Sequence, residues 1–353
     1  MCIVNCRLAF ADRFYLRTFQ NNAGCVAVNE CKFKRRASVF NIDCLTHFYC
    51  TKIQLLVTCY FCLVNFNTKF WNWLFLLVLA LIWGSSFILM KRGLDAFTSS
   101  QVAGLRMLIA FLFVIPFSFK YVKKAESKDW LKFLGIGLCG NFIPAFLFTA
   151  AETGISSSLT GMLNALTPFF TLGIGIIFFS MKAQTNKVIG LIIGLLGAVG
   201  LLIPEKYSDL GTNIGYGGYV FIATIFYGTS VNLIRRYAQN YHSITTTFWA
   251  MLLVGTFGGI YLLFTDFSSA VHHPLFWSSL GYVAILAIGG TALSVMLFNL
   301  LVKNTGTLFS ASVTYLIPIV AIGWGFFDGE EISIRQIISI FVILGGVYLV
   351  NRK

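Results

Sequence analysis

Long apolar runs separated by short polar loops fill the chain from Phe70 to its C-terminus. Ten of these runs predict membrane-spanning helices, because each can cross about 30 Å of hydrocarbon at about 1.5 Å per residue. The loops leave no room for a soluble catalytic domain. We therefore predict an all-α polytopic membrane protein with ten transmembrane helices at approximately residues 70–90, 98–119, 131–151, 155–180, 186–204, 215–235, 244–265, 276–301, 306–327 and 333–350.

The composition agrees with this pattern. Hydrophobic residues make up 57% of the chain and charged residues 11%, whereas about a quarter of a soluble domain is charged. A membrane β-barrel is disfavoured because its apolar segments are short and alternating. The net charge of +13 comes from basic residues in short loops, which orient a membrane protein and build no nucleic-acid groove.

Residues 1–67 differ from the rest of the chain, since they contain eight of its nine cysteines. The spacing of Cys59 and Cys62 is half of a zinc motif, but no second close pair or His-x3-5-His motif completes a ligand set. We therefore predict no metal and no cofactor. We expect this cysteine-rich N-terminal extension to lie outside the folded unit, as an upstream extension of a misassigned start; native peptides from residues 1–60 would contradict this.

An internal repeat divides the remaining chain. Ile82–Phe87 aligns with Phe226–Val231 at an offset of 144 residues, and Leu159–Pro168 aligns with Phe309–Pro318 at an offset of 150. We expect a first five-helix repeat at residues 68–209 and a second at 210–353. Because five is odd, the second copy enters the membrane from the opposite side. Such inverted repeats are typical of transporters that bind substrate near the membrane midplane.

Loop charge predicts the orientation. If residue 69 is cytoplasmic, the cytoplasmic loops hold thirteen basic residues and the external loops hold four. The positive-inside rule then places both ends of the bundle in the cytoplasm, in what we expect to be a bacterial inner membrane. Ser127 and Asp209 should therefore lie on opposite sides of the membrane.

Arg106 interrupts the apolar segment 101–115. A charge at membrane depth costs at least a few kcal/mol and is normally kept where it faces a bundle interior or an aqueous pathway. The alternative is a guanidinium that reaches the interface from near a helix end. The repeat places Ala250 at the equivalent position, so packing symmetry does not explain the charge. We expect Arg106 to face the interior and to serve transport.

A polar stripe lies on one helical face of the fourth span, because its members are spaced three or four residues apart: Ser157, Thr160, Asn164, Thr167 and Thr171. Pro168 leaves backbone groups available for hydrogen bonding. The stripe could line a substrate pathway or hold packed helices together. The ninth span carries a partial copy at Thr307, Ser310 and Thr314.

Trp83 and Tyr227 occupy equivalent repeat positions, each before a Gly-Ser/Thr-Ser step. An aromatic wall with small neighbours suits an organic solute, although core packing would also explain it. Asn141 and Asn299 are further amides within spans. The predicted substrate pathway therefore comprises Trp83, Ser85, Ser86, Arg106, Asn141, Thr160, Asn164, Thr167, Pro168, Tyr227, Thr229, Ser230, Asn299, Thr314, Tyr315 and Pro318.

The order and spacing of these elements resemble the EamA-type branch of the drug/metabolite transporter superfamily over about residues 70–350. The matching segments are Trp83–Phe87, Gly104–Ala110 with Arg106, Ser156–Pro168, Thr305–Ala311, Tyr315–Pro318 and Gly329–Glu331. Met181-Lys182 departs from the family, which often carries an acidic residue there. The resemblance implies a secondary transporter that exports small metabolites, such as amino acids or drug-like solutes, by alternating access.

Other functions have weaker support. A nucleotide-sugar or phosphate-ester exchanger would need several buried cations, and a membrane-embedded lipid enzyme would need a catalytic constellation that the spans do not show. No Walker-type loop is present. Glu152 is interpreted as a solvated loop residue, with a gate as the alternative, and no proton path can be assigned. The expected partners are a small-molecule substrate and the lipid bilayer, with no nucleic acid; a homodimer stays open.

Overall fold

The computed structural model describes residues 4–7, 15–18, 31–36, 39–44, 69–118, 129–181, 185–203 and 210–351. Contacts divide the chain into two units, Met1–Thr68 and Lys69–Lys353. The first unit contains an antiparallel sheet in the order β1-β2-β3-β4, which the sequence analysis did not predict. Its strands are β1 (Val4–Arg7), β2 (Tyr15–Thr18), β3 (Cys31–Arg36) and β4 (Val39–Cys44). The Cys59–Cys62 motif lies outside the described residues.

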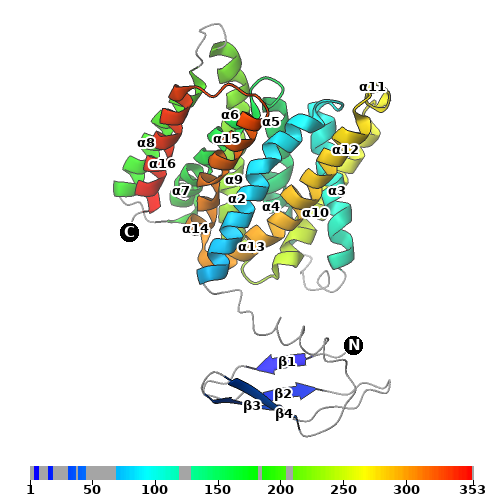
Figure 1. Cartoon of the computed structure of the whole chain (residues 1–353), viewed down its shortest axis with the longest axis vertical. Helices are drawn as coiled ribbons and strands as arrows, with labels where there is room; N and C mark the ends of the chain where they lie inside the picture. Colours follow the sequence, from blue (N-terminus) through cyan, green and yellow to red (C-terminus); the bar gives the residue numbers. More distant parts are fainter. Residues whose placement is uncertain are drawn as a thin grey trace. The chain divides into compact units, whose positions relative to one another are not determined.

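The second unit is a helical bundle (Figure 1). Its first half contains α2 (Lys69–Gly93), α3 (Ser99–Ser118), α4 (Trp130–Gly137), η3 (Leu138–Phe142), α5 (Ile143–Ala151), α6 (Ser157–Leu163), η4 (Asn164–Leu166), α7 (Thr167–Phe179) and α8 (Thr185–Leu202). Its second half contains α9 (Leu210–Tyr237), α10 (Ser243–Leu263), α11 (Ser268–Val271), α12 (Phe276–Ile285), η6 (Leu286–Leu293), α13 (Ser294–Thr305), α14 (Thr307–Ala311), η7 (Ser312–Tyr315), α15 (Ile317–Phe327) and α16 (Ile334–Asn351).

Nine helical stretches within the described residues are long and apolar enough to cross a membrane. The all-α multi-pass class is therefore confirmed, but the predicted count of ten is not. The tenth helix, α16, is apolar over Ile334–Gly346 only, which is shorter than the other spans. Large apolar side chains such as Phe178, Leu196 and Phe341 are exposed on the bundle surface, as a lipid environment permits.

Interruptions of the helices recur in both halves. The third span and its counterpart in the second half each contain a π-helical segment, η3 and η6, and a 3₁₀ turn, η4 or η7, precedes α7 and α15. The two 3₁₀ turns share a cause, because Pro168 and Pro318 stand in the first turn of α7 and α15 and cannot continue an upstream helix. Such mid-span irregularities leave backbone groups unpaired and are common at functional sites.

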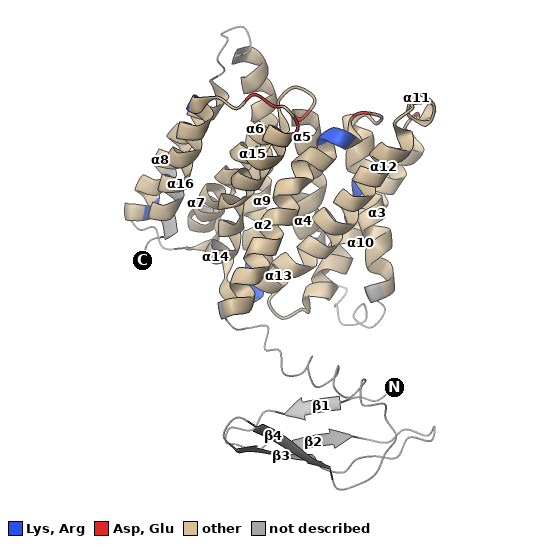
Figure 2. Ribbon diagram, in the orientation of Figure 1, with Lys and Arg blue, Asp and Glu red and all other residues tan. Residues whose placement is uncertain are grey.

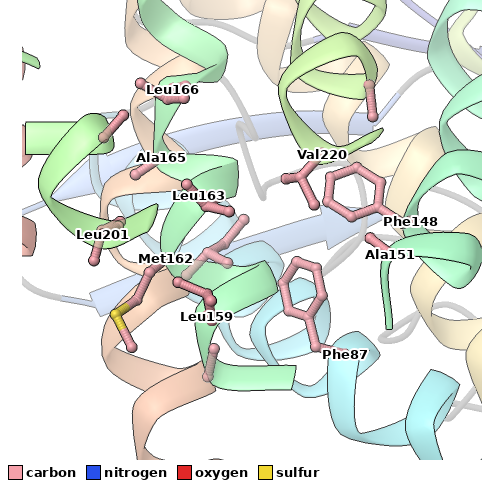
Figure 3. Close-up of a cluster of buried hydrophobic side chains, with 14 of the residues drawn as sticks. Phe87, Phe148, Ala151, Leu159, Met162, Leu163, Ala165, Leu166, Leu201 and Val220 are labelled. Carbon is pink, nitrogen blue, oxygen red and sulfur yellow. The ribbon is translucent and has the colours of Figure 1, made fainter. Parts of the chain in front are cut away.

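The largest hydrophobic core joins both halves of the bundle (Figure 3). Leu159, Met162 and Leu163 of α6 pack there with Leu201 of α8, while Phe87 of α2 approaches Phe148 of α5 with ring centroids 5.7 Å apart. All of α6 is buried, including its serines and threonine. The core therefore holds α6 rigidly beside α2, on the edge of the cavity described below.

Helices α8 and α16 lie side by side (Figure 1), and glycines let their backbones approach closely. A Cβ built on Gly197 would meet the backbone nitrogen of Ile343 at 2.9 Å, and one on Gly346 would meet the Gly190 oxygen at 2.6 Å. Gly190, Gly194 and Gly197 of α8 therefore lie at a packing seam with α16. Close packing of small residues is the usual stabilising contact between helices in lipid.

Replacing Gly346 with Ala should therefore destabilise the protein by about 1–3 kcal/mol, because the new methyl group meets backbone atoms that cannot move aside. Gly345 is the matched control, since a Cβ at Gly345 has no neighbour within 4 Å. Thermal unfolding of the purified variants in detergent should show a lower midpoint for Gly346→Ala than for Gly345→Ala. Equal midpoints would show that the two helices are not tightly apposed.

Candidate functional site

A cavity of about 90 Å³ lies between the two repeats. One water needs about 10–15 Å³ of such space, so the cavity has room for several waters or a small solute. Its wall contains both π-helical segments and both 3₁₀ turns, at Gly140, Asn141, Gly290, Asn164 and Thr314. The interruptions of the helices therefore converge on this space, where unpaired backbone groups can meet a ligand.

Arg106 of α3 lies at the cavity and is 7% exposed. Its Nε donates to Thr291 Oγ1 at 2.7 Å, its Nη1 contacts Met90 Sδ at 3.7 Å, and the Tyr227 side chain is a further hydrogen-bond partner. No carboxylate of the described residues lies within ion-pair distance of its guanidinium. A buried cation with only neutral partners is costly and strongly favours an incoming anion.

Trp83 forms one wall of the cavity and is held by two hydrogen bonds. Its indole Nε1 donates to the Gly290 carbonyl oxygen and to Ser294 Oγ, both at 3.0 Å. Its ring packs against Phe298 with centroids 5.1 Å apart. The Gly290 carbonyl belongs to π-segment η6, so this segment positions the aromatic wall as well as the Arg106 partner Thr291.

Tyr227 and two amides complete the polar lining. The Tyr227 ring stacks on Phe148 at 5.6 Å, and the Thr167 hydroxyl donates to the Asn164 carbonyl oxygen at 2.9 Å. Asn299 donates through Nδ2 to Thr247 at 2.9 Å, while its Oδ1 has no hydrogen-bond partner among the described residues. The cavity thus combines one cation, aromatic faces and amide acceptors.

The structure brings ten of the predicted pathway residues together around this cavity: Trp83, Ser86, Arg106, Asn141, Asn164, Thr167, Tyr227, Ser230, Asn299 and Thr314. The polar stripe of the fourth span divides between the two roles considered for it. Asn164 and Thr167 line the cavity, whereas the Ser157 hydroxyl donates to the Glu330 carboxylate at 2.8 Å and so links α6 to the α15–α16 connection.

Three predicted hydroxyl residues lie apart from the cavity lining. Ser85 points to another face of α2, where it accepts from Trp324 Nε1 at 2.8 Å. Thr160 and Thr229 each donate to the carbonyl one turn earlier in their own helix, at 2.9 Å. In each case the helical periodicity predicted that the residue would line the site. The side chain instead makes its hydrogen bond elsewhere, because of its rotamer or because it lies on another face of the helix.

The remaining predicted residues shape the wall without lining it. Pro168 and Pro318 are buried in the first turns of α7 and α15, where they end the upstream helical segment. Tyr315 is partly buried and packs against the large hydrophobic core. These residues position the 3₁₀ turns η4 and η7, which present Asn164 and Thr314 to the cavity.

Sequence reasoning missed Thr291, Met90 and Gly290, which contact Arg106 or Trp83. Thr291 follows Gly289-Gly290 in the middle of a span, and a double glycine there is the signal that could have indicated an irregular helix. Met90 offered no such signal, because an apolar residue in an apolar span is expected.

Charged residues gather at the end of the bundle where α15 leads to α16, which we call the acidic end after Asp328, Glu330 and Glu331 (Figure 2). Lys91 Nζ lies 2.7 Å from Asp328 Oδ2 and 2.8 Å from Glu330 Oε1, and Arg92 also pairs with Asp328. We call these four residues, Lys91, Arg92, Asp328 and Glu330, the ion-pair network. It ties α2 to the α15–α16 connection.

Glu330 also holds the start of α6. Its carboxylate accepts from the backbone N–H groups of Ser157 and Ser158, each at 3.0 Å, and from the Ser157 hydroxyl at 2.8 Å. Burial acts to raise the pKa of Glu330, but hydrogen bonds from Lys91, Ser158 and Ser157 outweigh burial and lower the pKa to about 2. Glu330 is therefore ionised at neutral pH and joins α2, α6 and the α15–α16 connection at the acidic end.

Glu152 is buried, with 8% of its surface exposed, so its interpretation as a solvated loop residue is wrong. It directly follows the third span, Trp130–Ala151, and its backbone N–H still bonds to the Phe148 carbonyl at 3.1 Å. The helical hydrogen bonding therefore extends one residue beyond the apolar segment, and the Glu152 side chain is buried in the bundle.

A multi-pass helical bundle with a cavity between two repeats, lined by apolar side chains and a few polar ones, has the architecture of a membrane transporter. The chain belongs to the EamA-like transporter family, whose model matches it twice, at residues 70–203 and 217–352. Each match covers one half of the bundle, and the predicted family is thereby confirmed.

Individual proteins agree with this family. The chain is 25% identical to an uncharacterized transporter of Archaeoglobus fulgidus, over 80% of this chain and 99% of that protein. It is 24% identical to a probable amino-acid metabolite efflux pump of Salmonella typhimurium, over 77% and 92% of the two chains. It is also 24% identical to the uncharacterized inner membrane transporter YedA of Escherichia coli, over 78% and 89%.

A solved structure titled only as a crystal structure of a protein shares the fold. Its TM-score is 0.60 at 15% sequence identity, and the alignment covers 80% of this chain and 97% of that chain. This likeness supports the arrangement of the helices. The family match and the apolar helices of the described residues together make the chain an integral multi-pass membrane transporter.

Proposed function

We propose that the chain exports small carboxylate-bearing metabolites of the amino-acid type by alternating access. The observation that carries this proposal is Arg106, a buried cation that faces a solute-sized cavity and has only neutral partners among the described residues. A guanidinium binds a carboxylate through two parallel hydrogen bonds. The name of the Salmonella typhimurium relative supports the same class of solute.

The other cavity residues suit the rest of such a solute. The carbonyl oxygens of Asn164 and Asn299 can accept from an ammonium group, and the faces of Trp83 and Tyr227 attract a cation or cover an apolar side chain. The Asn299 Oδ1 is buried without a hydrogen-bond partner among the described residues, so an incoming donor would satisfy it. The site thus offers complementary groups to both ends of an amino acid.

A phosphate-ester exchanger fits the cavity less well. A phosphate dianion needs two or more cationic partners, and Arg106 is the one cationic residue among those that line this cavity. We therefore propose that the site recognises a carboxylate. The experiment below compares carboxylate-bearing compounds with phosphate esters.

Exchange in proteoliposomes tests this function. Vesicles loaded with one unlabelled compound would be diluted into a solution of the same compound carrying a label. The panel would contain the L-amino acids, their N-acetyl derivatives, and a set of sugar phosphates and nucleotide sugars. We expect protein-dependent exchange of at least one carboxylate-bearing compound and none of the phosphate esters. Exchange confined to phosphate esters, or to no compound in the panel, would refute the proposal.

We further propose that the acidic end faces the outside of a bacterial inner membrane, on the basis of the loop charge. Ser127 and Asp209 lie outside the described residues, but they remain suitable positions for single cysteines. A membrane-impermeant maleimide should label Asp209→Cys in intact spheroplasts and Ser127→Cys only after permeabilisation. Labelling of both from the same side would contradict this topology.

A further inference from the structure

Glu152 lies near both the cavity and the ion-pair network. It is one helical turn beyond Phe148, which lines the cavity. The charge of Glu152 interacts with Arg106 at the cavity and with Lys91 and Glu330 of the ion-pair network. Substrate recognition at Arg106, as proposed above, does not involve this carboxyl.

The Glu152 carboxyl is buried, and neither of its oxygens has a hydrogen-bond partner among the described residues. The charged groups that interact with it electrostatically come from three elements: Arg106 from α3, Lys91 from α2 and Glu330 from the α15–α16 connection. Helix α9, which packs on α5, contributes two tyrosines: Tyr227 stacks on Phe148, and the Tyr216 ring lies against Gly154.

An ionised carboxylate in this position would lose its hydration without gaining a hydrogen bond. Burial therefore raises the pKa of Glu152 well above its ordinary value, and the negative charge of Glu330 adds to the increase, while Lys91 and Arg106 oppose it. Burial thus favours the neutral acid over the carboxylate. In that form Glu152 does not compete with a substrate carboxylate for Arg106.

We propose that Glu152 is a proton-binding site that links protonation to closure of the acidic end. The proposal rests on the proposed transport function, which it extends by naming the coupled ion. With the acidic end closed, Glu152 keeps its proton. When the ion-pair network separates and water enters, the carboxylic acid releases the proton to that water and the carboxylate is hydrated. Reprotonation precedes the next closure.

Cavity accessibility at different pH values tests this proposal directly. The reporter is Ser86→Cys in a variant without the native cysteines, because Ser86 lines the cavity. Labelling by an impermeant maleimide from the acidic end, corrected for the reactivity of a free thiol, should rise about tenfold between about pH 5.5 and pH 8.5, as ionised Glu152 favours the hydrated open state.

In the Glu152→Gln variant residue 152 cannot ionise. The Ser86→Cys reporter should therefore label slowly, and its labelling rate should change less than about twofold over the same pH range. Glu152→Asp keeps a carboxyl and should restore the pH dependence, whereas Glu331→Gln, an exposed neighbour of the network, should behave like the parent. A pH profile in Glu152→Gln equal to that of the parent would overturn the proposal, as would a flat profile in the parent.

Infrared spectroscopy of the complete protein in lipid supplies a second readout that needs no substrate. The parent should show a protonated-carboxyl C=O band at neutral pH that is absent from Glu152→Gln. Failure of exchange in the parent would refute the transport function and leave this band unaffected. Absence of the band at neutral pH would refute the proton site and leave exchange unaffected, so the two failures are distinguishable.

Discussion

Replacement of Arg106 by Gln is expected to reduce exchange of the carboxylate-bearing substrate at least about 100-fold, with a normal amount of protein in the membrane. Two charge-assisted hydrogen bonds are worth about 1.5–3 kcal/mol each, and each 1.4 kcal/mol corresponds to about a tenfold change in affinity. Gln keeps a donor but loses the charge and the planar pair of N–H groups. Initial rates of exchange over a range of substrate concentrations would measure the effect.

Arg106→Lys should give an intermediate loss. The ammonium keeps the positive charge, but it is a point charge that cannot form the two parallel bonds. It also cannot reproduce the Nε bond to Thr291 while reaching the cavity. The expected order of exchange rates is therefore Arg, Lys, Gln.

Arg236→Gln provides the matched control, because Arg236 is an exposed arginine on α9 and its removal should leave exchange near the parent value. Normal exchange in Arg106→Gln would reduce Arg106 to a structural charge. Absence of both Arg106 variants from the membrane would likewise show that Arg106 serves folding, because a residue that only binds substrate should not be needed for insertion.

Glu330→Gln is expected to open the acidic end. The substitution removes the ion pair with Lys91. In the parent, both carboxylate oxygens accept from the N–H groups of Ser157 and Ser158, whereas the Gln amide would turn its own N–H donor toward one of these donors. Loss of one or two charge-assisted bonds at about 1.5–3 kcal/mol each should shift the balance of open and closed states by roughly 10- to 100-fold. The Ser86→Cys reporter should then label correspondingly faster from this end.

Glu331→Gln is the matched control for this substitution, since Glu331 is exposed and its removal should leave the labelling rate unchanged. Equal rates in both variants would show that the ion-pair network does not hold the acidic end closed. Exchange should also slow in Glu330→Gln, because a carrier that prefers one open state cycles less often.

The pH dependence of this network follows from Glu330. Its pKa is lowered from the ordinary value of 4.5 to about 2 by its hydrogen bonds, so its contribution to closure is complete above about pH 4.5. The contribution is lost as the pH falls from about 4.5 towards 2. Any opening observed between about pH 5.5 and 8.5 therefore comes from another group, which allows the Glu152 proposal to be tested separately.

Much of this protein could be predicted from its sequence, for identifiable reasons. The membrane class follows from apolar run length, because nothing in hydrocarbon can replace the intrahelical hydrogen bonds. Arg106 was noticeable because a charge is rare at that depth. Trp83 and Tyr227 could be paired because the repeat places them at equivalent positions, and both line the cavity.

Periodicity was less reliable for choosing side chains within one helix. Asn164 and Thr167 line the cavity, whereas Thr160, at the same helical spacing, donates to the carbonyl of Ser156. The 3₁₀ turn η4 rotates the residues after Leu163 relative to those before it, so a regular helical projection does not describe this span. Local backbone irregularity is set by neighbouring helices and by Pro168, and its extent could not be calculated from spacing.

The sequence by itself determined the family, the division into two repeats and the single charge within the predicted pathway, because each depends on the local composition of one segment. Only the tertiary structure decided that Thr291 is a partner of Arg106, that Glu330 joins Lys91 to the start of α6, and that Glu152 is buried. These contacts join segments that are far apart in the chain or depend on how a helix ends. Their energies exist only after the helices have packed, so no pattern within one segment could reveal them.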